Sequence, residues 1–321
     1  MSLNTLPTLG NLSSFKSTTY SSPEPGLRVL ITGAVHGNET CGTHAILRVI
    51  GEIDAGLLAL KSGMVTFVPV ANTLAYQKKQ RNGDRNLNRR LRPTSDPKEF
   101  EDHVANWLCP LMQQHQVLLD LHSFRGDGQA FVMVGPENNQ AQVEPFTFAH
   151  EEESLAQSLG VNRFVDGWLS TYAKGVSRRN ASVSQHEFGM GTTEYMRSVG
   201  GYALTLECGQ HEDPEAREVA YRAILNTLKL LDLIDGSIEN GTNKMEALRI
   251  YEVVDKHHEN DQFSRAWASF DALEKGCLIG TRHDGTPVFS EMDGRIIFPD
   301  ANAVANEEWF YLARHNDRLE K

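Results

Sequence analysis

Cysteine is scarce in this chain of 321 residues: there are only four, at positions 41, 109, 208 and 277, and no two form a CxxC pair. Such spacing excludes a dense disulfide framework, so we expect free thiols. Long apolar runs are also missing, since about eighteen consecutive apolar residues occur nowhere, and the opening segment lacks the pattern of a signal peptide. These absences predict a cytoplasmic protein with no membrane partner.

Positive charge is in short supply as well, with 31 Lys and Arg against 42 Asp and Glu and a formal net charge of −11. A protein so acidic is repelled by nucleic acid and by anionic membranes, so neither is an expected partner. Its basic residues gather between Lys78 and Arg92, where seven of them accompany the single acid Asp84. A local cationic segment of this kind suits a small anionic ligand.

Apolar runs and helical periods alternate from residue 27 to about residue 234, the pattern of a largely parallel sheet covered by helices. The near-continuous apolar character of the runs predicts strands buried on both faces. These predicted strands cover residues 28–32, 65–70, 117–121, 131–134 and 202–206. The predicted helices cover about residues 39–53, 97–115, 151–159 and 214–233, the last with Asp213 as its N-cap.

The pattern changes near residue 240, where a polar, glycine-bearing stretch is followed by short apolar runs separated by turns. Those runs predict strands at residues 248–254, 277–281, 287–290 and 294–298. We therefore predict an α/β fold, with a mostly parallel mixed sheet flanked by helices. A catalytic domain of residues 1–240 would be followed by a small β-rich C-terminal domain of residues 241–321.

His36 and Glu39 follow the first predicted strand, at the position where open α/β sheets bind their ligands. Both side chains could reach one cation across a tight turn, which Gly37 would permit. A loop histidine beside an acid at a helix N-terminus would give the same sequence, so the pair is weak evidence alone.

His122 ends the predicted strand 117–121, and Asp120 lies two residues back on the same strand face, where it could orient the imidazole. A strand-end histidine bonded to the backbone is the alternative. Together with His36 and Glu39, however, His122 completes the His₂Glu set of a catalytic zinc with one open position.

Glu207 ends an otherwise apolar predicted strand, where a carboxylate is costly unless it faces a functional cavity. It could be the base that a catalytic metal requires. A salt-bridge acid at the rim of the domain is the alternative.

Four segments in this order resemble the succinylglutamate desuccinylase and aspartoacylase family of zinc carboxypeptidase-like hydrolases. They are GAVHGNE at 33–39, Asn72 with Arg81 and Asn88-Arg89, DLH at 120–122, and LECG at 206–209. The resemblance implies the same fold, with a β-rich C-terminal domain, and one zinc ion per chain held by His36, Glu39 and His122. It also implies that Glu207 is the acid/base residue and that Arg81 polarises the scissile carbonyl.

The resemblance further implies that Asn88 and Arg89 bind a substrate carboxylate, and that Arg197, ten residues before Glu207, is a second carboxylate-binding arginine. A solvated basic loop is the alternative for such a run of arginines. Two positions depart from the family pattern. Asn86 stands where an acid is usual, which affects substrate identity, and Thr73 stands where a proline is common.

The expected function is hydrolysis of the amide bond of an N-acyl amino acid or a similar small carboxylate, with zinc as cofactor. The expected partner is this small anionic substrate; a homo-oligomer is left open. One alternative is a metallocarboxypeptidase that acts on peptides or cell-wall fragments. Another is a non-catalytic zinc-binding protein, which the presence of Glu207 and Arg81 disfavours.

Overall fold

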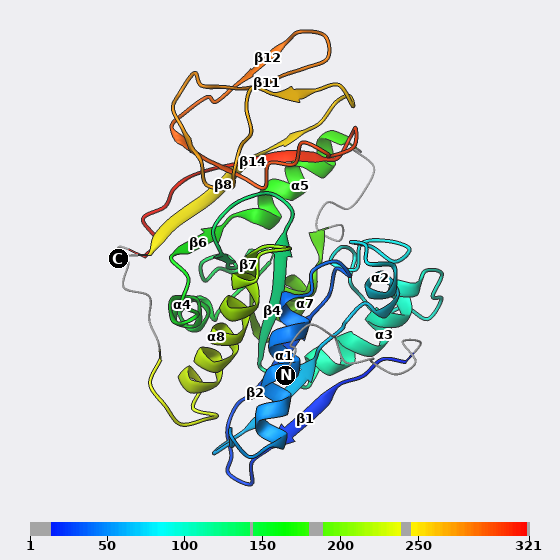
Figure 1. The fold of residues 1–321 in the computed structure, drawn as a ribbon, viewed down its shortest axis with the longest axis vertical. Helices are drawn as coiled ribbons and strands as arrows, with labels where there is room; N and C mark the ends of the chain where they lie inside the picture. Colours follow the sequence, from blue (N-terminus) through cyan, green and yellow to red (C-terminus); the bar gives the residue numbers. More distant parts are fainter. Residues whose placement is uncertain (1–13, 142–143, 180–188, 239–244, 320–321) are drawn as a thin grey trace.

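The computed structural model describes residues 14–141, 144–179, 189–238 and 245–319, and its centre is one mixed sheet of eleven strands (Figure 1). The sheet order is β1-β3-β2-β4-β7-β5-β6-β8-β14-β13-β10. Its strands are β1 (Thr18–Ser21), β2 (Arg28–Gly33), β3 (Met64–Val68), β4 (Val117–Phe124), β5 (Phe131–Met133), β6 (Arg163–Asp166), β7 (Tyr202–Gln210), β8 (Glu246–Asp255), β10 (Ala272–Leu273), β13 (Gly294–Ile297) and β14 (Glu308–His315).

Strands β3, β2, β4 and β7 are parallel neighbours, and they carry the apolar runs expected to form buried strands. β5 pairs antiparallel with β7, after which β5, β6 and β8 are again parallel. A small antiparallel sheet of β9 (Gln262–Phe263), β11 (Leu278–Thr281) and β12 (Pro287–Phe289) lies near the C-terminus, at the top of Figure 1. The predicted fold class is confirmed.

Helices cover both faces of the large sheet. Alternate strand residues point to opposite sides, and apolar side chains on both sides pack against helices. Ile31 and Leu119 belong to the core beneath α1 (Cys41–Asp54), α4 (Ala149–Ser158) and α8 (Glu215–Leu230). Leu30 and Leu118 face the other way, toward α3 (Phe100–Gln113) and α7 (Thr192–Ser198). These side chains are fully buried, which accounts for the unbroken apolar runs. In the described parts of the chain, no helix is long and apolar enough to cross a membrane.

The C-terminal strands continue the large sheet, because β8 pairs in parallel with β6 and β14, β13 and β10 follow it. Trp309 and Phe310 of β14 are fully buried and pack with Ile279 of the small sheet. The predicted domain boundary near residue 240 falls at residues 239–244, outside the described residues, so the division into two domains stays a prediction.

Several elements were not predicted. They include β6, β14, α7, α2 (Thr73–Lys78) and α5 (Trp168–Arg179). The short helix α7 is held by tertiary contacts, since Tyr195 and Met196 are buried in the core next to α3. Local propensity alone does not stabilise so short a helix, which is why its pattern is weak in the sequence. α8 begins at Glu215, one residue later than predicted, and the Asp213 carboxylate accepts a hydrogen bond from the Glu215 N–H at 2.9 Å.

Candidate metal centre and active site

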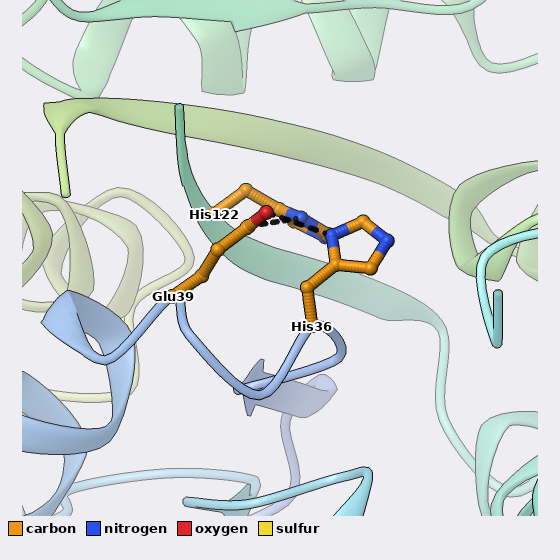
Figure 2. Close-up of side chains that lie close together, drawn as sticks. All are labelled: His36, Glu39 and His122. Atoms are coloured by element: carbon orange, nitrogen blue, oxygen red, sulfur yellow. Dashed lines mark hydrogen bonds and ion pairs between the residues drawn. The ribbon is translucent and has the colours of Figure 1, made fainter. Parts of the chain in front are cut away.

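His36, Glu39 and His122 come together because β2 and β4 are parallel neighbours whose carboxyl ends lie side by side. Gly33 at the end of β2 is in register with Leu121 of β4. The loop after β2 carries His36 and Glu39, while His122 lies on β4 itself. Figure 2 shows the three side chains pointing toward one another. All three are buried, with 1–2% of each residue exposed.

Gly37 is required in this loop by close packing. A Cβ placed on Gly37 would lie 1.9 Å from the backbone carbonyl carbon of Ala75 in α2. The loop therefore rests directly on α2, and the Glu39 N–H closes a turn onto the His36 carbonyl oxygen at 3.1 Å. Any larger residue at position 37 would displace the two side chains on either side of it.

The Glu39 carboxylate is the centre of the cluster. Its Oε1 lies 2.9 Å from His36 Nδ1 and accepts a hydrogen bond from Arg81 Nη1 at 3.0 Å. Its Oε2 lies 2.9 Å from His122 Nδ1 and accepts one from the Ser123 N–H at 3.2 Å. The potential ligand atoms of His36, Glu39 and His122 all lie within 4.8 Å of one another. Arg81 thus lies beside the cluster, and it was predicted to act there.

The outer nitrogen of each histidine faces an oxygen. His122 Nε2 lies 2.8 Å from Asp120 Oδ2, and His36 Nε2 lies 3.0 Å from Asn86 Oδ1. Asn86 Oδ1 also accepts from the Asn88 N–H at 2.9 Å, and this obligate donor identifies the atom as oxygen. Both Nε2 atoms therefore carry hydrogen, so in the neutral imidazoles the Nδ1 lone pairs face the Glu39 carboxylate.

Two imidazole lone pairs that converge on a carboxylate require a positive charge between them, either a proton on a ring or a metal ion. The donor set therefore fits a metal ion, and the outer acceptors are the partners that orient metal-ligating histidines. In the metal-free protein a proton supplies this positive charge, and the pKa values place it between His122 and Glu39. Burial raises the pKa of Glu39, but the two imidazoles outweigh burial and hold it well below its usual range. Burial lowers the pKa of His122, but Asp120 and Glu39 raise it well above the usual range.

Glu207 faces the same cluster from the next strand, since it is in register with His122 across β4 and β7. The residue is 8% exposed, and its Oε2 is buried with no hydrogen-bond partner among the described residues. Burial, aided by the nearby charges of Glu39 and Asp120, raises its pKa to about 8 although His122 and Arg81 oppose the rise. An unpartnered buried carboxylate is costly, which favours a functional role over a rim salt bridge.

A cavity of about 660 Å³ opens over the cluster. Its lining includes His36, His122 and Glu207. The C-terminal part of the chain also lines it, through Pro299, Asp300, Val304, Glu308 and Tyr311. The cavity lining also includes the other predicted site residues, which are Arg81, Asn88, Arg89 and Arg197. Every residue predicted for the site thus lies in or directly beside one cavity.

The family model described as "Succinylglutamate desuccinylase/Aspartoacylase catalytic domain" matches residues 25–156, which hold the candidate metal ligands. Over these residues the chain is similar to the catalytic domain of the succinylglutamate desuccinylase/aspartoacylase family. The members of this family are amidohydrolases. A curated relative, succinylglutamate desuccinylase of Pseudomonas aeruginosa (strain UCBPP-PA14), is 24% identical over 299 residues, covering 88% of this chain and 82% of the relative.

Two solved structures share the fold. The succinylglutamatedesuccinylase/aspartoacylase from Rhodobacter sphaeroides has a TM-score of 0.73 at 18% identity, covering 94% of this chain and 90% of the other. The product-bound ectoine utilization protein EutE (DoeB) from Ruegeria pomeroyi has a TM-score of 0.71 at 17% identity, covering 93% of this chain and 88% of the other. The similarity thus extends over the C-terminal strands as well as the family's catalytic domain.

Arg89 lies at the cavity wall, next to two aromatic rings. Its guanidinium carbon lies 4.7 Å from the ring centroid of Trp168 and 4.5 Å from that of Tyr172. These two rings stack on each other, with centroids 4.9 Å apart, and are one turn apart on α5. Asn88 is fixed through its Oδ1, which accepts the Thr192 N–H at 2.8 Å. The residue lines the cavity.

Arg197 is buried, and acids occupy most of its guanidinium. Nε and Nη2 donate to Glu152 at 3.0 and 2.7 Å, and Nη1 donates to Glu144 at 3.0 Å. Nη2 also donates to the Ala203 carbonyl oxygen at 2.9 Å. Little of the guanidinium is left for a bidentate contact with a second carboxylate. The predicted contact between Arg197 and substrate stays a prediction.

Sequence reasoning did not place His211, which also lines the cavity. Its Nδ1 lies 2.9 Å from Ser123 Oγ, and Asn38 Nδ2 lies 3.3 Å from its Nε2. It follows Glu207 by four residues, just beyond the end of β7, and this proximity to a candidate catalytic strand end was the available signal. The aromatic pair Trp168 and Tyr172 was missed because α5 was not predicted.

Replacing Gly37 by alanine should destabilise the protein by about 3 kcal/mol, because the new methyl group cannot fit against Ala75. Urea unfolding of the metal-free protein measures this change. Gly51→Ala is the matched control, since a Cβ there meets nothing within 4 Å and the change should be neutral or favourable by up to about 1 kcal/mol. Equal effects of the two substitutions would contradict the packing argument.

Replacing Glu207 by glutamine should stabilise the metal-free protein at high pH. A buried acid whose pKa is raised from 4.5 to about 8 costs the folded state increasing stability as pH rises through that window. Below pH 4.5 the melting temperatures of wild type and Glu207→Gln should therefore be equal. Above about pH 8 the melting temperature of the variant should be the higher of the two. Glu259→Gln, which alters an exposed carboxylate, should show no such divergence. A variant less stable than wild type above the window would refute the predicted environment of Glu207.

Proposed function

We propose that this chain is a zinc-dependent hydrolase that cleaves the amide bond of an N-acyl amino acid or a similar small carboxylate. The observation that carries the proposal is the buried cluster of His36, Glu39 and His122, with the unpartnered Glu207 carboxylate opposite it in one cavity. Two histidines and one glutamate are the ligand set of catalytic zinc in hydrolases, which makes zinc the best candidate ion.

When bound, the ion would supply a Lewis acid and a water of lowered pKa. Glu207 would take a proton from the attacking water at its unpartnered Oε2 and, once protonated, would pass it to the departing nitrogen. Its raised pKa suits both transfers, because the group can gain and lose a proton near neutral pH. Arg81 would donate to the developing oxyanion from its place beside Glu39.

Asn88 and Arg89 would bind the carboxylate of the substrate. The two aromatic rings hold the Arg89 guanidinium in one orientation, so little conformational entropy is lost when a carboxylate binds. The Asn88 amide presents a further N–H donor beside it. The pairing of Arg197 with Glu144 and Glu152 favours a supporting role for that arginine. We therefore assign the main carboxylate contact to Asn88 and Arg89.

The cavity supports a small substrate over a peptide chain. Residues 299–311 contribute part of its wall, and its volume of about 660 Å³ is typical of small-molecule sites. A metallocarboxypeptidase needs a longer groove. The relatives named succinylglutamate desuccinylase make succinylglutamate the first substrate to try.

Zinc-loaded protein should release free amino acid from at least one member of a panel of N-acyl amino acids, and should leave peptides with free C-termini uncut. Glu207→Gln should lower kcat by about 10²–10⁴. Arg89→Lys should raise KM by about tenfold, because lysine lacks the planar bidentate fork. Arg265→Lys is the matched control, since Arg265 also stacks on an aromatic ring, Trp267 at 3.6 Å, but lies outside the cavity lining.

Cleavage of peptides without cleavage of any N-acyl amino acid would reject the proposed substrate class. Full activity in Glu207→Gln would reject the proposed base.

A further inference from the structure

A continuous set of hydrogen bonds runs behind the candidate metal ligands, from one histidine to the other. We call its four intermediate members the outer circuit: Asn86, Asn88, Thr192 and Asp120. On the first side, Asn86 Oδ1 contacts His36 Nε2 at 3.0 Å and accepts the Asn88 N–H at 2.9 Å. On the second side, Asp120 Oδ2 contacts His122 Nε2 at 2.8 Å and accepts the Thr192 hydroxyl at 2.5 Å.

Thr192 joins the two sides. Its backbone N–H donates to Asn88 Oδ1 at 2.8 Å, while its hydroxyl donates to Asp120. Glu39 closes the ring in front, through its contacts with both Nδ1 atoms. The outer circuit therefore connects the two histidines and also includes Asn88, which we assign to the substrate carboxylate.

Every bond in the outer circuit has a fixed direction. The backbone N–H groups of Asn88 and Thr192 can only donate, so the atoms that face them are amide oxygens. The Asp120 carboxylate can only accept when ionised. Thr192 and Asp120 are fully buried, so water cannot replace a lost partner cheaply.

We propose that Asn86 and Thr192 are positioning residues of the metal site. They hold the rings and tautomers of His36 and His122, Asn86 directly and Thr192 through Asp120, so that both Nδ1 lone pairs face one point. Both residues also form hydrogen bonds with Asn88, which we assign to the substrate carboxylate. They therefore hold Asn88 at a fixed position relative to that point. The inference rests on the proposed function only for the identity of the ion.

The test is the zinc affinity of the full-length, metal-stripped protein, measured by competition with a chromophoric chelator. Asn86→Ala should weaken zinc binding by about tenfold, since it removes the outer partner of a ligand. Thr192→Val should weaken it by about fivefold, the value of one hydrogen bond. Thr192→Ser keeps the hydroxyl and should bind like wild type. Asn86→Asp keeps the acceptor and should bind at least as tightly.

Thr227→Val is the matched control. Thr227 is also fully buried, but its hydroxyl has no hydrogen-bond partner among the described residues and it lies on α8. Its zinc affinity should equal that of wild type. In the double variant of Asn86→Ala and Thr192→Val, the loss should be smaller than the product of the single losses, because either change already opens the circuit.

Equal zinc affinities of Thr192→Val and Thr227→Val would overturn the proposal. So would a double variant whose fold-loss of zinc affinity equals the product of the two single fold-losses. The measurement needs no substrate. If no N-acyl amino acid is hydrolysed, the proposed function is contradicted, but the zinc-affinity measurement still tests the roles of Asn86 and Thr192.

Discussion

The Glu39 carboxylate, buried between two imidazoles, is the interaction on which the rest of the site depends. A carboxylate at this depth is stable only with compensating charge or hydrogen bonds. Here they come from His122, Arg81 and the Ser123 N–H. The parallel pairing of β2 and β4 supplies this arrangement, because it places two strand ends at one edge of the sheet.

The same constraint explains what could be predicted from the sequence. A polar residue at the end of a fully apolar strand stands out, and parallel strands end at a common edge. His36, Glu39 and His122 could therefore be grouped before their distances were known, and they are indeed grouped. The buried central strands were predictable for a similar reason, since burial on both faces leaves an unbroken apolar run.

The remaining features depend on contacts that spacing does not reveal. Arg197 was predicted as a carboxylate-binding arginine, but its acidic partners Glu144 and Glu152 lie 53 and 45 residues away in sequence. Asn86 was noted in the sequence only as a departure from the family pattern that affects the substrate, whereas its side-chain oxygen contacts His36, a candidate metal ligand. Thr192 lies on a helix too short to be predicted, which hid its link to Asp120.

The most direct test of the central claim is anomalous diffraction at the zinc edge from crystals of the zinc-loaded protein. The account predicts one strong peak per chain, bound by Nδ1 of His36, Nδ1 of His122 and the Glu39 carboxylate, with both Nε2 atoms still on Asn86 and Asp120. A strong peak elsewhere, or no peak at this cluster in protein shown to contain zinc, would contradict it.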